Sequence, residues 1–544
     1  MRKILLSALA VTFPALLSAQ AFVSSVDAYQ FSQSDLRGTA RFMSMGGAFG
    51  ALGGDLSTLT QNPAGIGVYR SSEIGISMDI DMHSSDVEGN KNDFTRVYCP
   101  NVGYIGSIRT GSEIMPFFQW GVSFGRKVSF DRTFSGAYGD LGTSLSNYIA
   151  NFSNGYSPDL LGQSDTYNPY NESRADWLSI LAYNSYIINP VGNTSVYNGL
   201  FNEAGPNASY GDAQYYVNQR GHIDEYSINF GGNFVNTVYW GIGFGISDFS
   251  FTQEAWYDEQ IGNARIPSSA APGAGATTGQ AYYNLSNYRR VTGSGFNVKI
   301  GAIVKPINEL RFGFAIHTPT YYSFSETSDA AIDYSFDQKT GIPDGTAYTD
   351  YAYFDWKMQS PWKLMFSAAT VVGGRFILSA DYECDFFKNM RVKDNNGNEY
   401  TDITSDIKYY YKPQSTVRIG AEFRVSPNFS LRAGFADTFS AVEKSANEGG
   451  TFDAAGNLVG DAVEVYTAGL NPAYTFDTNT RYITLGVGYR YKGFYIDAAY
   501  VNKHRESTYH PFTSYVDSQG SMLAPLTDFT SNENRIILSA GYKF

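Results

Sequence analysis

The chain has 544 residues, a formal net charge of −13 and 55 glycines, with 16% aromatic and only 17% charged residues. The acidic balance makes nucleic acid a poor partner, because a nucleic-acid-binding surface needs a basic patch. The two cysteines, Cys99 and Cys384, stand far apart without a CxxC motif or a nearby histidine. This excludes a structural zinc site and argues against a disulfide framework, so we expect no metal and no cofactor.

Residues 1–19 have the order of a secretory signal peptide: two basic residues, an apolar run over 4–17 and two small residues. The apolar run is too short to span a bilayer, and no later stretch reaches the roughly 18 consecutive apolar residues of a transmembrane helix. The mature chain is therefore predicted to be exported and to begin near Gln20. If it enters a membrane, it does so with strands.

Residues 20–70 are rich in glycine and alanine and contain the sequence Asn62-Pro63-Ala64-Gly65 near their end. Pro63 fixes its own φ and disfavours helix at Asn62, while Gly65 can adopt a left-handed conformation, so we expect a turn into the first strand. The segment is either a compact plug or a flexible periplasmic tail. A tail would carry more charge and proline, which favours the plug.

In the first strand pattern, over 71–82, apolar residues alternate strictly with small or polar ones. One face carries Ile74, Ile76, Met78, Ile80 and Met82, and the other carries Asp79 and Asp81. Similar alternation recurs near 309–321 and 411–425. A soluble sandwich would bury the apolar face, whereas a membrane barrel turns it to lipid and the charges to the lumen. The pattern of one strand does not distinguish the two.

The connections between strands do distinguish them, because short turns alternate with long connections, as in outer-membrane barrels. The long connections are predicted at 131–221, 252–288, 322–352, 388–410, 438–478 and 503–531. The strands are predicted at 71–82, 97–110, 116–130, 222–234, 238–251, 289–304, 309–321, 353–371, 375–387, 411–425, 429–437, 479–490, 494–502 and 532–544. The chain is therefore predicted to be all-β, a transmembrane antiparallel β-barrel of about fourteen strands over 71–544, with residues 20–70 as an N-terminal plug in its wide lumen.

The last predicted strand ends at the last residue of the sequence, with Tyr542 and Phe544 on its apolar face. A terminal aromatic residue would fray at the edge of a sandwich, whereas in a barrel it closes against the first strand and lies in the aromatic girdle. Tyr542 and Phe544 are thus predicted to form the assembly signal.

The segment RFMSMGGAFGALGGDLSTLTQNPAGIG, residues 41–67, resembles the hatch of the FadL/TodX-type outer-membrane transporters of long-chain fatty acids and other hydrophobic compounds. Phrases at 309–324, 360–383 and 417–436 resemble strand pairs of the same family. The resemblance implies a fourteen-stranded barrel plugged by its N-terminal segment. It also implies an extracellular capture groove, an apolar pocket, and a sideways opening at an inward kink of strand three.

On this resemblance, the expected function is passive uptake of hydrophobic small molecules, with fatty acids as the default class, in the outer membrane of a Gram-negative bacterium. The expected partners are these ligands, outer-membrane lipids and the barrel-assembly machinery, and the protein is expected to be a monomer.

No HExxH, GxSxG or phosphate-binding loop occurs, so no catalytic residue is assigned and the chain is not expected to be an enzyme.

Five inward positions are candidates for ligand binding: Arg109, Arg311, His317, Arg418 and Arg424. Most inward charges are expected to pair with one another across strands, but a guanidinium can also hold both oxygens of a ligand carboxylate.

In the 131–221 loop, residues 174–188 have near-helical apolar spacing. This helix is either a first contact for an oily substrate or a lid packed on its own barrel.

Two other functions stay open at the level of sequence. Some barrels of this family serve as accessories in protein secretion, presenting loops to exported proteins. Haem binding would require axial ligands, for which His504 and His510, in the predicted loop after strand thirteen, are the candidates.

Overall fold

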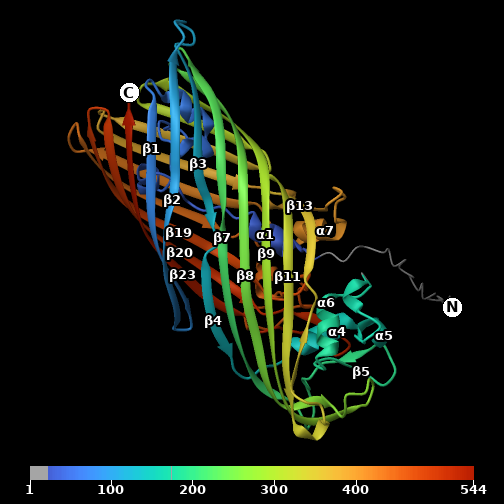
Figure 1. Cartoon of the computed structure of the whole chain (residues 1–544). Helices are drawn as coiled ribbons and strands as arrows, with labels where there is room; N and C mark the ends of the chain where they lie inside the picture. The colour runs from blue at the N-terminus through green and yellow to red at the C-terminus, as the bar shows by residue number, and fades with distance from the viewer. Residues whose placement is uncertain (1–21, 173) are drawn as a thin grey trace, which may run out of the picture.

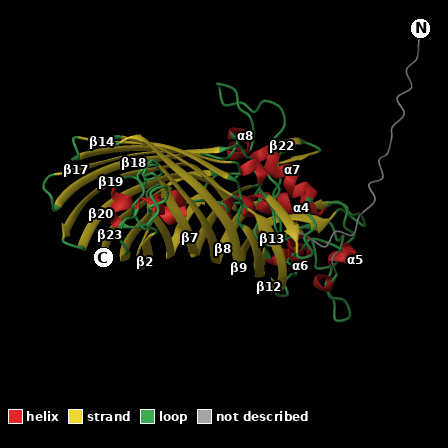
Figure 2. Ribbon diagram, turned by 90° about the horizontal axis from the view of Figure 1, so that it is seen from above, coloured by secondary structure: helices red, strands yellow, loops and turns green. Residues whose placement is uncertain are grey.

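The computed structural model describes residues 22–172 and 174–544, and the predicted signal peptide lies outside them. The described chain forms a closed antiparallel barrel (Figure 1; Figure 2). Strand β1 (Glu73–Val87) pairs along its length with β2 (Asn90–Arg109) and with the last strand, β23 (Thr527–Lys543). Since the first strand closes on the last, the wall has no free edge at this seam, and the predicted fourteen-stranded barrel is confirmed.

Between β2 and β23, the wall is built in chain order from β3 (Phe117–Ser129) continued by β4 (Arg132–Tyr138), β7 (Tyr210–Phe234), β8 (Val238–Pro267), β9 (Ala276–Ile307), β10 (Leu310–His317) continued by β11 (Tyr321–Phe336), β13 (Ala352–Gln359) continued by β14 (Lys363–Val372), β15 (Phe376–Asp385) continued by β16 (Arg391–Asp394), β17 (Gln414–Arg424), β18 (Phe429–Phe439), β19 (Tyr474–Tyr491) and β20 (Phe494–His510). The connections add β5 (Asn189–Pro190), β6 (Tyr197–Asn198), β12 (Gly345–Tyr348), β21 (Tyr515–Asp517), β22 (Gly520–Met522), α4 (Leu145–Ser153), α5 (Pro158–Leu161), α6 (Trp177–Asn184), α7 (Thr401–Tyr410), α8 (Lys444–Glu448), η2 (Pro169–Asn171), η3 (Gln338–Thr340) and η4 (Phe387–Asn389).

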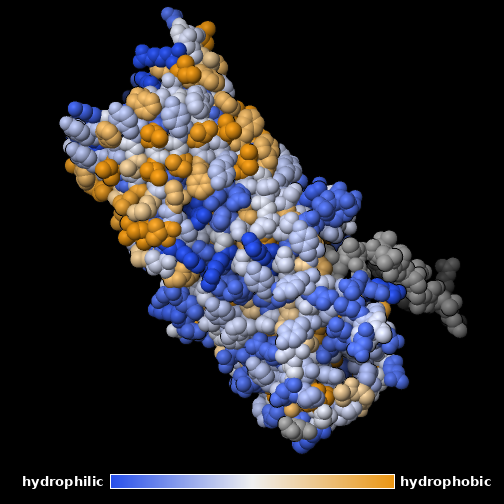
Figure 3. All heavy atoms as spheres, viewed as in Figure 1, coloured by the Kyte–Doolittle hydropathy of each residue, from blue (hydrophilic) through white to orange (hydrophobic). Residues whose placement is uncertain are grey.

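The outer face carries an apolar band next to the short turns (Figure 3). Ile74 is 50% exposed, Ile76 56% and Leu538 41%, whereas Asp79 and Asp81 on the opposite face of β1 are buried. The predicted orientation of the first strand is therefore confirmed. Outward apolar and inward polar side chains are typical of strands that face lipid.

Among the described residues, no helix is long and apolar enough to cross a bilayer.

Most strands continue well beyond the predicted ends, and the connection predicted at 252–288 is wrong. Strand β8 runs on to Pro267, and β9 begins at Ala276. The reason is a reversal of polarity along the strand: the outward side chains of β8 are apolar as far as Ile246 and become polar from Asp248. Past that point the apolar side chains point inward, so the hydropathy pattern of a lipid-facing strand ends although the strand does not.

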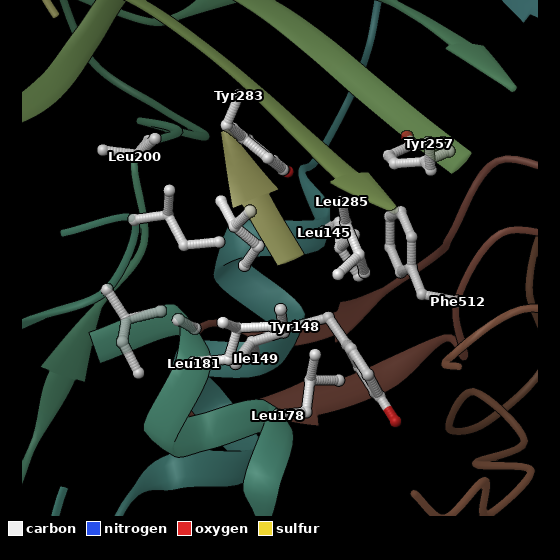
Figure 4. Close-up of a cluster of buried hydrophobic side chains, with 14 of the residues drawn as sticks. Leu145, Tyr148, Ile149, Leu178, Leu181, Leu200, Tyr257, Tyr283, Leu285 and Phe512 are labelled. Carbon is white, nitrogen blue, oxygen red and sulfur yellow. The ribbon is translucent and has the colours of Figure 1, made fainter. Parts of the chain in front are cut away.

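The long connection after β4 folds into a small helical cap (Figure 4). Its helices α4 and α6 pack against the extended strands in one cluster, in which Leu145, Ile149, Leu178 and Leu181 meet Tyr257, Tyr283, Leu285 and Phe512. The helix predicted within 174–188 is α6, and its packing is that of a lid on its own barrel. The predicted loop 131–221 is shorter than expected, because β4 and β7 take up both of its ends.

The N-terminal segment fills the lumen with α1 (Ser25–Phe31) on the loop side and with α2 (Ala40–Ser44), α3 (Thr58–Gln61) and η1 (Pro63–Val68) in the short-turn half. Helix α2 contacts β18, β19, β20 and β23, while η1 contacts β3, β7, β8 and β9. The plug thus touches opposite sides of the wall, and its core residues, among them Met45, Phe49 and Ala51, have no exposed surface.

The Asn62-Pro63-Ala64-Gly65 sequence has a different role from the predicted one. Asn62 is extended and its side chain accepts a hydrogen bond from the Ala64 amide, but Pro63 opens η1 instead of a turn into β1. Gly65 is absent from the residues with positive φ. A side chain there would place Cβ 2.5 Å from Oγ1 of Thr58, so glycine is required for close packing within the plug.

Inward-facing glycines of the wall allow the plug backbone to approach the strands. A Cβ at Gly434 would lie 2.1 Å from the Gly46 nitrogen, one at Gly241 2.2 Å from the Pro63 oxygen, and one at Gly420 2.4 Å from the Met45 oxygen. These contacts leave no room for a methyl group, so the plug lies directly on the strand backbones.

The terminal residue lies at the closing seam. Backbone hydrogen bonds of 3.0 Å join Ser72 and Phe544 in both directions, and the Phe544 ring lies 5.9 Å from that of Tyr542. Both rings are exposed on the outer face. Their role as an assembly signal stays a prediction.

We predict that Gly434→Ala and Gly241→Ala each destabilise the protein by about 1–3 kcal/mol, because the added methyl forces the plug away from the wall. Thermal unfolding followed by circular dichroism would show a lower midpoint for both variants. Gly142→Ala is the control, because a Cβ there meets no atom within 4 Å. Equal midpoints for all three variants would contradict close plug packing.

Candidate functional site

Buried ion pairs hold the plug to the wall in the short-turn half of the barrel. The guanidinium of Arg37, on the plug, lies 3.5 Å from Asp79 and 3.3 Å from Asp81 of β1. Arg535 of β23 also pairs with Asp79 and donates to the Leu36 oxygen of the plug at 2.9 Å. All four side chains are at most 5% exposed. Because removing one partner would leave a buried charge unpaired, the network fixes the plug in place.

Of the predicted ligand-binding residues, His317 and Arg418 lie beside the plug. Nε2 of His317 is 2.7 Å from the Gln61 oxygen, and Arg418 donates to Glu383 at 2.8 Å. Glu383 is shared with Lys363, 3.4 Å away. These groups are inward, as alternation predicts, but their partners are the plug and neighbouring strands.

The other three candidates lie near the short-turn rim. Arg311 donates to the Leu52 oxygen of the plug at 2.8 Å, whereas Arg109 and Arg424 are exposed at the last residues of β2 and β17. The structure thus does not bring the five residues together. Alternation indicates which side a residue faces, but not the level of the lumen at which the plug lies.

An aromatic chamber occupies the lumen on the loop side of the ion-pair network. We define it by Phe130, Phe249, Phe251, Phe324 and Trp356, and all five are at most 8% exposed. The ring of Phe31, from plug helix α1, lies inside it, 4.8 Å from Phe249 and 5.2 Å from Phe251. The chamber is therefore apolar and filled by a side chain of the plug itself.

One cation lies at the edge of the aromatic chamber. The guanidinium of Arg289 lies 5.6 Å from the centre of the Phe31 ring and pairs with Asp27, one helical turn before Phe31 in α1. It also donates to Glu326, which accepts a further bond from the Trp356 indole at 3.0 Å. Helix α1 thus presents a ring to the chamber and a carboxylate to the cation.

The wall is interrupted beside the chamber. Strands β2 and β3 pair only from Asn101 with Gly125 to Arg109 with Phe117, although β2 continues to pair with β1 far beyond that point. The register of β3 against β7 also shifts between Arg126 and Val128. Over residues 90–100, β2 therefore has no backbone partner on its β3 side among the described residues.

Side chains bridge this interruption. The Tyr98 hydroxyl donates to Asp131 at 2.5 Å, and Nδ2 of Asn90 donates to the Ser135 oxygen at 3.1 Å. Two cavities of about 50 Å³ flank α1, and one of them is bounded by Phe130 and Asp131 at the interruption. Such cavities have room for a few water molecules only. The chamber and the interruption are thus adjacent but filled.

A larger cavity, about 670 Å³, lies in the loops between α4, α7 and residues 513–515. Tyrosines supply much of its lining: Tyr148, Tyr156, Tyr400, Tyr410, Tyr466 and Tyr515. Its volume is in the range of small-molecule sites. Burial, together with the charge of Asp402 one turn away, raises the pKa of Asp406 in this cavity to about 6.

Phe31 and the aromatic chamber are not among the residues that the sequence predicts for the site. Phe249, Phe251 and Phe324 alternate with polar residues on their strands, which is a detectable signal. The predicted boundaries put Phe249 and Phe251 in the last residues of one strand and Phe324 in a connection, so they do not group these rings inside the lumen.

The histidines suggested for haem do not form a site. Both lie within β20 rather than in a loop, six residues and therefore roughly 20 Å apart. Nδ1 of His504 lies 2.8 Å from the Asn532 side-chain oxygen, and His510 stacks on Tyr474 at 4.6 Å. Two axial ligands of one iron would need to face each other. Among the described residues, no group of three or more His, Cys, Asp or Glu side chains could hold a metal ion.

These features define a class of protein: a closed fourteen-stranded β-barrel with an apolar outer band and a lumen plugged by its own N-terminal segment. No protein-family model matches the chain, and no curated protein matches it. Similar solved structures include a Pseudomonas aeruginosa FadL homologue, with 14% identity and a TM-score of 0.49 over 94% of this chain and 99% of that one.

Two toluene transporters are also similar. TodX of P. putida has 11% identity and a TM-score of 0.44, and TbuX of Ralstonia pickettii has 13% identity and a TM-score of 0.43. Each comparison covers 94% of this chain and 99% of the other. Identities this low transfer no function to this chain.

We predict that Asp406→Asn raises the thermal unfolding midpoint at pH 7.5 and leaves it unchanged at pH 4. The folded-state pKa is raised, so the ionised carboxylate destabilises the fold above about pH 6, and this penalty disappears once the group is protonated. Midpoints measured across this range test the prediction, with the exposed Asp461→Asn as control. A constant difference at every pH would contradict it.

Proposed function

We propose that the protein is an outer-membrane channel for passive uptake of hydrophobic small molecules, with long-chain fatty acids as the ligand class. A ligand enters from the loop side, displaces Phe31 from the aromatic chamber, and leaves through the interruption between β2 and β3 into the membrane. The observation that carries the proposal is the chamber itself: an apolar space beside an unpaired stretch of wall, occupied by a side chain of the plug.

The energetics allow this exchange. Burying a phenylalanine side chain stabilises by about 1.5–3 kcal/mol, and each buried methylene contributes about 0.8 kcal/mol. A chain of about two to four methylenes therefore matches Phe31, and a longer chain displaces it with a gain. The apolar side chains around Phe31, including Val291 and Ile223, extend the surface available to such a chain.

The contact between α1 and Arg289 supports a ligand with a carboxylate. When α1 moves out, Phe31 and Asp27 leave together, because they lie one turn apart on the same helix. A fatty acid replaces both: its chain occupies the chamber, and its carboxylate takes the place of Asp27 on the guanidinium. A purely apolar ligand would leave Arg289 with only Glu326.

The filled short-turn half of the barrel supports a sideways exit. The plug and its buried ion pairs stand between the chamber and the short-turn rim. A polar solute has no open route through them, and an apolar ligand would pass only by breaking paired charges. The interruption begins at the edge of the apolar band, because Val97 and Val102 of β2 are exposed there, whereas the exposed β2 side chains further along, Lys91, Asp93 and Thr95, are polar.

The same proposal places the protein in the outer membrane as a monomer. Its further partners are outer-membrane lipids on the apolar band and the barrel-assembly machinery, for which Tyr542 and Phe544 are the proposed signal. The tyrosine-lined loop cavity is the proposed first contact for ligand. No cofactor and no catalytic step is part of the proposal.

Crosslinking the interruption tests the route. In a background of Cys99→Ser and Cys384→Ser, Tyr98→Cys and Asp131→Cys are joined with a short bismaleimide, and uptake of a fluorescent fatty acid by whole cells is measured. We expect uptake to fall at least tenfold after crosslinking, because β2 and β3 can no longer separate.

The matched control joins Val102→Cys and Phe124→Cys, which lie opposite each other in the paired part of the same two strands. This crosslink should leave uptake unchanged. Normal uptake with the first pair crosslinked would exclude an exit between β2 and β3.

A second test addresses the ligand class through the contacts of Arg289. We predict that Asp27→Asn raises the affinity for oleate, because it frees the guanidinium, and that Arg289→Gln lowers it about tenfold or more. Neither of these two changes in affinity should appear with oleyl alcohol, because it has no carboxylate. Calorimetry on the purified protein measures both ligands.

The control for these variants is Arg391→Gln, which removes an ion pair between β16 and Glu399 of the connection that follows it. It should affect neither ligand. Parallel changes for oleate and oleyl alcohol would show that Arg289 acts on the fold and not on a ligand carboxylate.

A further inference from the structure

Another cavity lies at the opposite end of the barrel from the loops. Its volume is about 250 Å³, and it separates plug residues 52–54 and 68–71 from the wall. The wall residues that line it all lie within two residues of a strand end at the short-turn rim, among them Arg311, Arg490 and Lys543. The exposed Arg70 stands at its mouth, so the cavity opens at this rim.

The charged side chains that line this rim cavity are all basic. Five basic side chains line it, Arg41, Arg70, Arg311, Arg490 and Lys543, and its described lining contains no Asp or Glu. Two of the five are compensated from outside the cavity, because Arg41 lies 3.1 Å from Glu422 and Lys543 lies 2.8 Å from Glu73.

The other three lack a carboxylate partner within the described structure. Nη1 of Arg311 donates to a plug carbonyl, but its Nε is buried without a hydrogen-bond partner. Among the described residues, Arg490 makes no side-chain hydrogen bond or ion pair. Arg41 repels both Arg490 and Arg311, and Asp497 and Glu422 attract Arg490 only from beyond ion-pair distance. Arg70 has only a 3.5 Å contact with Asn236.

We propose that the rim cavity is a binding site for a phosphate-bearing ligand. Guanidinium groups pair with phosphate through two parallel hydrogen bonds, and three of them converge here without a carboxylate partner. A bound phosphate relieves the repulsion among the arginines and satisfies the buried Nε of Arg311. It also joins the plug to β10 and β19, so it fastens the plug at the rim.

The ligand comes from one of two sources that share this chemistry, a soluble phosphate or the headgroup of a membrane lipid at the rim. Calorimetry on the purified full-length protein at constant ionic strength compares inorganic phosphate with dihexanoyl phosphatidic acid. Similar affinities identify a soluble source, and affinity at least tenfold higher for the lipid identifies a headgroup. We also expect phosphate to raise the thermal unfolding midpoint in a concentration-dependent manner.

The double variant Arg311→Gln/Arg490→Gln should weaken binding of the preferred probe at least tenfold. Its control is Arg375→Gln/Arg424→Gln, which removes the same charge from exposed positions outside the cavity on the same rim. If the double variant fails to fold, the single variant Arg490→Gln serves, since that side chain has no ion-pair partner to lose.

Binding of neither probe by the wild-type protein would overturn the proposal, as would equal losses in the cavity variant and its control. Fatty acid binding in the aromatic chamber should be the same in all of these variants. The proposal for the rim site and the proposal for the uptake route can therefore be contradicted independently of each other.

Discussion

The width of the barrel is the constraint on which the rest of the structure depends. Fourteen strands enclose a lumen that their own side chains cannot fill, so a second body must occupy it. The N-terminal segment can do so because glycines on both surfaces let backbone lie against backbone, as Gly46 does on Gly434. Every polar group that this contact buries then needs a partner, and the ion pairs of Arg37 and Arg535 follow from that requirement.

The same constraint separates the lumen into two levels. Near the short turns, the wall faces lipid, and its charges point inward to pair with the plug. Beyond the apolar band the outer face is polar, and the aromatic rings of β8 and β11 turn inward to form the chamber around Phe31. Helix α1 belongs to both levels, because it is continuous with the plug and yet fills the chamber. Its position therefore couples occupancy of the chamber to the plug.

The sequence was sufficient to predict the barrel but not the contacts inside its lumen. Alternation such as that from Ile74 to Met82 predicts a strand with one apolar face, and the alternation of short turns with long connections predicts that this face meets lipid. The same rule failed beyond Ile246, where the outward residues become polar and the strand continues. For Gly65, the residue was singled out correctly but for the wrong reason, since its neighbour Thr58, and not its φ, demands glycine.

The candidate site was harder to predict because its contacts join distant parts of the chain. The inward orientation of His317 and Arg418 could be inferred from alternation, but their partners could not, as Gln61 is more than 250 residues away from His317. The same holds for Phe31 and its surrounding rings. Sequence periodicity describes one strand at a time, whereas a chamber is defined by which strands are neighbours across the lumen.

The seam between Ser72 and Phe544 also restricts the order of folding. The lumen does not exist until the last residue pairs with the first strand, yet the plug must already be inside when that pairing completes. Its contacts come from β7 to β9 on one side and β18 to β23 on the other, so they cannot all form on a partly built sheet. Enclosure of the plug and closure of the wall are thus one cooperative event among contacts of long sequence separation, which makes it intrinsically slow.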